Sequence, residues 1–313
     1  MPATSWRLTL GIAAVLSIAS LIAHLLRLRL AARKPHPTID NLNSRIKAWW
    51  MIALSVGIAF LGGKTGIILL FALASLAAWR EYLPPAATTE SGSAWQRIAL
   101  PLLLVTTQYG LVWHARFPLF SLLLPIGALI VLLSSRLYRR HSPQFFATTR
   151  RVLSALLITV YGISHVPALL HLSTDVDPYR GAYMLLFLLL VVQLGDVLQY
   201  LWGKLAGRQP IAPTISPGKT VEGTIGGIAS AALLGGALAG LTPFGPLEAM
   251  LVSLLLSLLG FAGGLMMSAE KRRRGIKDWG NLLPGHGGML DRLDSLFLSA
   301  PFFYWLLRYG WVD

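Results

Sequence analysis

The chain of 313 residues contains no cysteine, and charged residues make up only 13% of it. The absence of cysteine excludes disulfide bonds and metal sites built on thiolates. An average soluble domain has roughly 25% charged residues, whereas this sequence has few charges and 55% apolar residues. The composition therefore excludes an ordinary soluble domain and predicts an integral membrane protein.

Long apolar runs recur along the chain and predict membrane-spanning helices. A helix needs about 20 residues to cross a hydrocarbon core of about 30 Å. We therefore expect an all-α, polytopic membrane protein with about 8–10 transmembrane helices. Ten candidate spans lie near residues 8–26, 48–61, 65–79, 98–113, 119–135, 152–171, 181–202, 222–242, 248–267 and 291–308.

Three of these spans leave alternatives open. Residues 48–61 and 65–79 are short, so they could be tilted, re-entrant or interfacial segments. Residues 8–26 could be a signal peptide, but the basic residues follow this run instead of preceding it. That order favours an uncleaved membrane anchor.

Acidic residues are scarce as well, because 13 Asp and Glu stand against 27 Lys and Arg, which gives a net charge of +14. In a soluble protein this excess would suggest a nucleic-acid partner. With the N-terminus outside, however, most basic residues fall in or beside the inner loops, as the positive-inside rule requires. We therefore expect no nucleic acid and an inner face that is cytoplasmic. Only five basic residues lie outside: Arg7, Lys64, Arg116, Arg180 and Arg308.

The polar residues divide the chain into two expected parts. Residues 1–180 have the pattern of N-terminal transmembrane helices joined by short basic loops. From about Gly181 the inner loops also contain glycine, proline, serine and acids, so we expect residues 181–313 to form a catalytic transmembrane domain. Spaced glycines there suit close packing of membrane helices and predict a structural role for Gly223, Gly227, Gly236 and Gly240.

Asp196 lies within a long apolar run. A carboxylate in lipid is costly unless it faces protein, water or a cation. We expect it to face inward, toward a site; the alternative is a hydrogen bond to Gln193, Gln199 or a neighbouring helix. The loop that follows contains residue types that bind phosphate: Lys204, Arg208, Ser216, Lys219 and Thr220.

Gly218-Lys219-Thr220 resembles the end of a P-loop only superficially, because that motif needs a glycine where Pro213 stands. The last inner loop is more informative. A glycine-rich turn at residues 284–288 precedes a helix expected to begin near Met289, and such a turn lets backbone amides approach an anion.

Asp291 and Asp294 are three residues apart and share one helix face. Together with Asp278 and Asp196 they could hold Mg²⁺ through oxygen ligands. The alternative is that these acids form ordinary ion pairs with Lys277 and Arg292. For the basic run 271–274 alone we favour a simple role as the positive flank of a membrane helix.

Two motifs between residues 180 and 310 resemble the phosphatidate cytidylyltransferase family, also called CDP-diacylglycerol synthases. The chain departs from the family pattern at Gln199 and Val221, and its N-terminal half resembles the family only in hydropathy and in Arg80-Glu81-Tyr82. The signature, at residues 268–294, comprises Ser268, Lys271, Arg272, Lys277, Asp278, Gly280, Pro284, His286, Gly287, Gly288, Asp291, Arg292 and Asp294. The second motif comprises Asp196, Tyr200, Gly203, Lys204, Ser216, Pro217, Lys219, Thr220, Glu222 and Gly223.

The resemblance implies an enzyme of the bacterial inner membrane that converts CTP and phosphatidate to CDP-diacylglycerol and pyrophosphate. It also implies Mg²⁺ as cofactor, with up to two cations, one of which could be K⁺. The expected partners are CTP, phosphatidate and the lipid bilayer, with a homodimer left open. The alternatives are a CTP-dependent transferase or kinase acting on another lipid, or a transporter with an inner ion site.

The resemblance also implies roles for individual residues. Acids would bind the metal, cations would offset phosphate charge, and hydroxyl and amide groups would hold phosphate oxygens. The expected metal ligands are Asp196, Asp278, Asp291 and Asp294, and the catalytic set adds Lys219 and Arg292. The expected substrate-binding residues are Lys204, Ser216, Thr220, Lys277, His286, Gly287 and Gly288.

Overall fold

The computed structural model describes residues 17, 20–21, 37–83, 94–137, 143–174, 177–282 and 287–311. Within these ranges the chain is almost entirely helical, and its only sheet is a two-stranded hairpin. The all-α prediction is therefore confirmed. Most of the predicted span at residues 8–26 lies outside the described residues.

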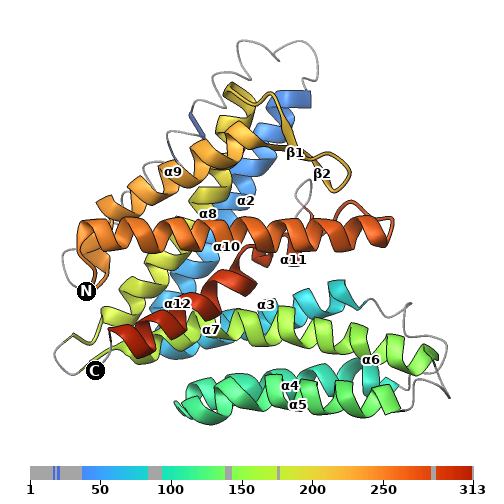
Figure 1. The fold of residues 1–313 in the computed structure, drawn as a ribbon. Coiled ribbons are helices and arrows are strands. Elements are labelled where there is room, and N and C mark those ends of the chain that lie inside the picture. The colour runs from blue at the N-terminus through green and yellow to red at the C-terminus, as the bar shows by residue number, and fades with distance from the viewer. Residues whose placement is uncertain are drawn as a thin grey trace.

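In the first part, α2, α4, α7 and the π-helix η2 pack against α3, and α5 and α6 pack against each other (Figure 1). One long helical segment changes type along its length, from α-helix through a π-helical stretch to a final 3₁₀ turn. The bounds are α2 Pro37–Leu61, α3 Gly63–Tyr82, α4 Ala94–Trp113, α5 Phe117–Leu137, α6 Pro143–Ala155, the π-helix η2 Leu156–Gly162, α7 Ile163–Ala168 and the 3₁₀ turn η3 Leu169–Leu172.

The second part contains the two longest helices, α8 and α10, and the hairpin. Strands β1 and β2 pair antiparallel, with Pro210 opposite Thr220. The hairpin lies in the loop that the sequence assigned to phosphate-binding residues. The bounds are α8 Arg180–Leu205, β1 Pro210–Ala212, β2 Ser216–Thr220, α9 Val221–Ala237, the 3₁₀ turn η4 Ala239–Leu241, α10 Pro246–Arg273, α11 Leu290–Leu293 and α12 Leu296–Gly310.

Five helical segments of the described chain are long and apolar enough to cross a membrane, which supports a polytopic protein. Three shorter apolar helices lie at 49–61, 99–113 and 221–237. The helices at the short predicted spans extend further than the apolar runs, because α2 starts at Pro37 and α3 ends at Tyr82. The five long segments are 63–82, 117–136, 145–172, 180–205 and 246–273.

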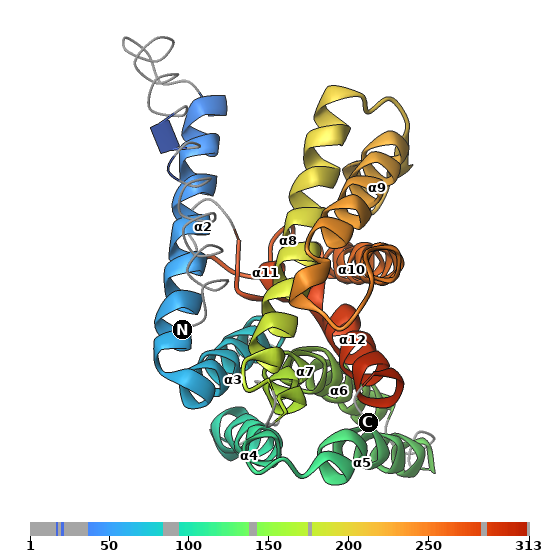
Figure 2. The ribbon, with the colours of Figure 1, turned by 90° about the vertical axis from the view of Figure 1, so that its left-hand side faces the viewer.

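Helices α8, α9 and α10 pack against one another, and α4 and α5 lie away from them in both views (Figures 1 and 2). Gly227 permits the close contact of α9 with α8, since an added Cβ would lie 2.4 Å from the Gln199 Cα. The packing role predicted for the spaced glycines is confirmed for Gly223, Gly227 and Gly236, but Gly240 faces open space.

A single apolar cluster runs through both parts of the chain, from Ala59 in α2 to Leu307 in α12. Among its largest fully buried members are Phe120 of α5, Phe187 of α8 and Tyr304 of α12. Helix α3 therefore shares a core with α12 and the π-helix, and its C-terminal end comes to lie beside the signature residues. The boundary expected at residue 180 stays a prediction.

Candidate active site

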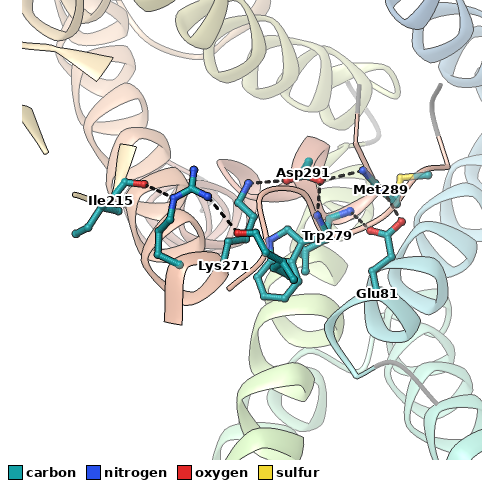
Figure 3. Close-up of polar contacts among 10 residues, drawn as sticks. Glu81, Ile215, Lys271, Trp279, Met289 and Asp291 are labelled. Carbon is teal, nitrogen blue, oxygen red and sulfur yellow. Dashed lines mark hydrogen bonds and ion pairs between the residues drawn. The ribbon is translucent and has the colours of Figure 1, made fainter. Parts of the chain in front are cut away.

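Asp291 joins three separate segments of the signature (Figure 3). Its Oδ1 accepts a hydrogen bond from Lys271 Nζ at 2.7 Å, and its Oδ2 accepts from the backbone amides of Trp279 and Gly288, both at 2.9 Å. The side chains of Lys271 and Asp291 are 12% and 9% exposed, so this ion pair is largely shielded from solvent. Charge-assisted hydrogen bonds of this kind are short and strong. Asp291 thereby ties the end of α10 to the start of α11.

The glycine turn before α11 makes room for that carboxylate. Gly287 has φ +80°, a conformation that only glycine adopts without strain. A Cβ there would lie 2.6 Å from Asp291 Oδ2. The sequence predicts that the amides of Gly287 and Gly288 bind a phosphate, but in the structure the Gly288 amide donates to the protein's own carboxylate. His286 lies outside the described residues.

Glu81, in the last turn of α3, contacts the same turn from the N-terminal part of the chain (Figure 3). Its Oε1 accepts from the Met289 amide and its Oε2 from the Leu290 amide, each at 2.8 Å. Sequence reasoning assigned Glu81 no chemistry. The available signal was an acid and a tyrosine closing an apolar helix, but only the fold places them beside residues more than 200 positions away.

The basic run at the end of α10 is not a simple membrane flank, which corrects the interpretation favoured for it. Lys271 pairs with Asp291. Arg272 donates from Nε to the Ile215 carbonyl and from Nη1 to the Ile276 carbonyl, both at 3.1 Å. Figure 3 labels Ile215, the residue of the hairpin turn whose carbonyl Arg272 binds. Of the four residues, Arg272 and Arg273 are exposed, but Arg272 still binds two backbone carbonyls.

Arg274 locks the end of α10 to the end of α3. Its guanidinium carbon lies 4.2 Å from the centroid of the Tyr82 ring and 4.9 Å from that of Trp279. It also pairs with Glu270 at 2.8 Å and donates to the Tyr82 carbonyl. The rings of Tyr82 and Trp279 stack at 5.2 Å. Cation–π contacts of this geometry stabilise a partly buried arginine.

A second acidic centre forms where α8 meets the residues after α11. The charges of Asp196 and Asp294 act on each other, and the charge of Lys219 acts on both. A Cβ added at Gly264 of α10 would lie 3.0 Å from Lys219 Nζ and 3.9 Å from Asp294 Oδ2, so this glycine leaves space where the two groups meet. Lys219 Nζ also lies 4.8 Å from the centroid of the Phe261 ring. The structure thus brings together three predicted residues from separate elements.

The expected set of metal ligands is assembled only in part. Within the described ranges, no three acids or histidines form a ready-made metal cluster. Asp278 is exposed, and Asp291 already accepts three hydrogen bonds. Asp196 and Asp294 are partly accessible. Mg²⁺ is commonly held by one or two carboxylates, with waters and substrate phosphates completing its octahedron. This pair fits that pattern.

Arg292 lies between the two centres in sequence, and its charge acts on Asp196. Its carbonyl accepts from Gln193 Nε2 at 3.1 Å. The Gln193 amide therefore binds backbone, which does not favour the alternative in which it binds Asp196.

The remaining predicted residues lie in two places. Ser216 opens β2, and the Thr220 hydroxyl caps α9 by accepting from the Gly223 amide at 3.1 Å. Lys204 and Lys277 are exposed, with Lys204 Nζ lying 5.8 Å from the centroid of the Tyr200 ring. The structure does not bring these two lysines into either acidic centre.

The chain belongs to the cytidylyltransferase family, which matches residues 43–310. Over 299 residues it is 37% identical to a protein of Escherichia coli (strain K12) named Uncharacterized protein YnbB, covering 95% of this chain and 96% of that protein. It is 42% identical over 135 residues to the phosphatidate cytidylyltransferase of Bacillus subtilis (strain 168), covering 42% of this chain and 50% of the relative. For the phosphatidate cytidylyltransferase of Staphylococcus aureus (strain COL), the identity is 42% over 124 residues, covering 39% of this chain and 48% of the relative. The chain thus matches about half the length of the relatives that carry this name.

Proposed function

We propose that the protein is a phosphatidate cytidylyltransferase that converts CTP and phosphatidate to CDP-diacylglycerol and pyrophosphate. The observation that carries the proposal is the convergence of Asp196, Lys219 and Asp294 from α8, β2 and the residues after α11. Such a site, in a helical membrane protein of the cytidylyltransferase family, suits a reaction between a nucleotide and a lipid phosphate.

The chemistry needs positioning and charge compensation more than it needs a base. A phosphate oxygen of phosphatidate attacks the α-phosphorus of CTP, a new P–O bond forms, and the bond to the β-phosphate breaks to release pyrophosphate. The nucleophile is already anionic at neutral pH, so the main barrier is the approach of two anions. Preorganised positive charge is the effective means of lowering such a barrier.

Lys219 and Arg292 are the cations next to the acidic pair, and we assign them to the charge of the triphosphate. Asp196 and Asp294 would hold Mg²⁺, and K⁺ is the candidate second cation. A bound divalent ion neutralises phosphate charge and orients the reacting groups. Ser216, on the same strand β2 as Lys219, would donate a hydrogen bond to a phosphate oxygen.

We place this site on the cytoplasmic side of the bacterial inner membrane. The positive-inside pattern supports that side, because the basic end of α10 adjoins the signature. The contact of Glu81 with Met289 and Leu290 agrees, since it requires the inner loop after α3 and the signature to share one face of the membrane.

The test is an assay of the purified protein in detergent or nanodiscs with CTP, phosphatidate and Mg²⁺. The expected products are CDP-diacylglycerol and pyrophosphate in equal amounts, with no product in EDTA. Release of CDP with a newly phosphorylated lipid would indicate a CTP-dependent kinase, and turnover only with another lipid phosphate would indicate a different transferase. Absence of turnover with every lipid phosphate would leave the transporter alternative and overturn the proposal.

A further inference from the structure

The C-terminal end of α3 holds the signature turn by a contact that the proposed chemistry does not itself require. Both carboxylate oxygens of Glu81 are used, one for each of two consecutive amides, at Met289 and Leu290. We propose that Glu81 is a positioning residue for cytidylyl transfer, an inference that rests on the proposed function. It acts through the turn 287–290 to fix the Asp291 carboxylate and the start of α11.

The backbone amides along the turn are divided between two carboxylates. The Gly288 amide donates to Asp291, and the next two amides donate to Glu81. Helix α11 has only four residues, and the first amides of any helix lack partners within the helix. Two carboxylates from separate parts of the chain therefore satisfy three successive amides. A shift of one carboxylate would move the amide bound to the other.

Two glycines of the signature leave the space that the Glu81 side chain occupies. A Cβ added at Gly280 would lie 2.6 Å from Glu81 Oε1, and one added at Gly288 would lie 2.3 Å from Oε2. Both distances are far below a normal carbon–oxygen contact. The two glycines therefore pack directly against this carboxylate, and a larger residue at either position would displace it.

Helix α3 is itself held in place at the end that carries Glu81. The neighbouring Tyr82 is buried, stacks on Trp279 and lies against the Arg274 guanidinium. The Trp279 amide in turn donates to Asp291. The end of α3 therefore contacts two of the segments that Asp291 joins: Glu81 binds the turn 287–290, and Tyr82 stacks on Trp279. Such locked support is what holds reacting groups in a productive geometry.

The experiment compares Glu81→Gln and Glu81→Ala with the matched control Glu248→Gln in the full-length protein. Glu248 also accepts a backbone amide at a helix start, that of Gly245 at 2.9 Å. It lies about 35 Å along α10 from Lys271, by the rise of an α-helix. The glutamine variant of residue 81 keeps the side-chain volume and one acceptor oxygen, so it keeps the test valid if the alanine variant fails to fold.

We expect a fall in kcat of about 100-fold for Glu81→Ala, the scale of a misplacement of about 1 Å. The fall should be smaller for Glu81→Gln and absent for Glu248→Gln. KM for phosphatidate should stay unchanged in all three, because both carboxylate oxygens of Glu81 are already bound to backbone amides. Loss of folding stability without a change in kcat would show that the contact is only structural and would overturn the proposal.

A double-mutant cycle tests the contact independently. Gly280→Ala should lower turnover in the wild-type background, because its methyl group would displace the Glu81 carboxylate. Gly280→Ala should have little further effect in the Glu81→Ala background, because the carboxylate that its methyl group would displace is absent. Additive losses would contradict the proposed coupling, since residues that share one contact give non-additive effects.

Hydrogen–deuterium exchange of the segment 287–293 separates this inference from the proposed function. The amides of Met289 and Leu290 should exchange faster in Glu81→Ala than in wild type or Glu248→Gln, whether or not CTP is turned over. Unchanged exchange would overturn the positioning role. Faster exchange in a protein without cytidylyltransferase activity would instead refute the proposed function while leaving the contact established.

Discussion

The two acidic centres of the second half differ in how their negative charge is compensated. At Asp291, one carboxylate meets a lysine and two backbone amides, so the protein itself satisfies the group. At Asp196 and Asp294, two carboxylates act on each other and share Lys219 as their nearest common cation. The first centre is complete as folded, whereas the second holds two like charges close together, an arrangement that an external cation can stabilise. The difference distinguishes a joint that holds the signature from a site that binds a ligand.

Asp291→Asn should break the first centre and give the largest loss. Removing one partner of a shielded ion pair leaves Lys271 uncompensated, which costs about 3–5 kcal/mol of stability. Turnover of CTP should fall to background as well. Denaturation in mixed micelles and the CDP-lipid assay would measure the two effects. The double variant Lys271→Met with Asp291→Leu should recover part of the stability but no turnover, because no charge is left unpaired while the Trp279 and Gly288 amides still lack their acceptor. Recovery of turnover would show that Asp291 has no role in the reaction.

Asp294→Asn should separate activity from stability at the second centre. We expect turnover to fall more than about 100-fold, beyond the loss typical of residues that only support metal ligands. The free energy of unfolding without metal should stay the same or rise, because a like-charge repulsion with Asp196 is removed. A marked destabilisation would mean that Asp294 belongs to the structural joint, and the two centres would then not differ as described.

Mg²⁺ should stabilise the wild-type protein through the second centre. At a concentration 100 times its dissociation constant, a ligand that binds only the folded state adds about 2.7 kcal/mol. The melting temperature should therefore rise with added Mg²⁺ and return with EDTA. Asp294→Asn should lose this response and Arg273→Ala should keep it. An identical response in Asp294→Asn would place the cation elsewhere.

Two variants of the basic run should have the smallest effects on stability. Arg274→Ala should cost about 2 kcal/mol, because it removes the contacts with Tyr82, Trp279 and Glu270. Arg273→Ala, at a side chain that is 68% exposed, should change stability by less than about 0.5 kcal/mol. Equal losses from the two variants would restore the interpretation of the run as a uniform flank.

Much of the fold could be predicted from the sequence because it depends on local composition. Apolar runs long enough to span a bilayer become helices, and α8 and α10 match the predicted spans at 181–202 and 248–267 closely. The signature residues were also found in the sequence, from their polar density and from the family resemblance. The spacing of residues in the sequence could not predict which charged side chains form ion pairs. Lys277 and Arg292 were the partners of the acids in the alternative of ordinary ion pairs, but Asp291 pairs with Lys271, twenty positions earlier.

The missed residue shows the limit most clearly. Glu81 follows an apolar helix in the part of the chain with few polar motifs, and nothing local connects it to a glycine turn 208 residues later. Likewise, the exposure of Asp278 and Lys277 depends on how the segment after α10 turns back at Gly275, which has φ +69°. Local patterns identify the candidates, but tertiary packing selects among them.

The long sequence separation between Glu81 and its partners sets an order of events during synthesis. The ribosome makes α3 and inserts it well before it makes Leu290, 209 positions later. Until then the acid at the end of α3 has none of the amides it finally binds. A nascent chain therefore carries this carboxylate without its native partners through the insertion of most of its helices, and of the described helices only the rest of α11 and α12 remain to be made after the partners of Glu81.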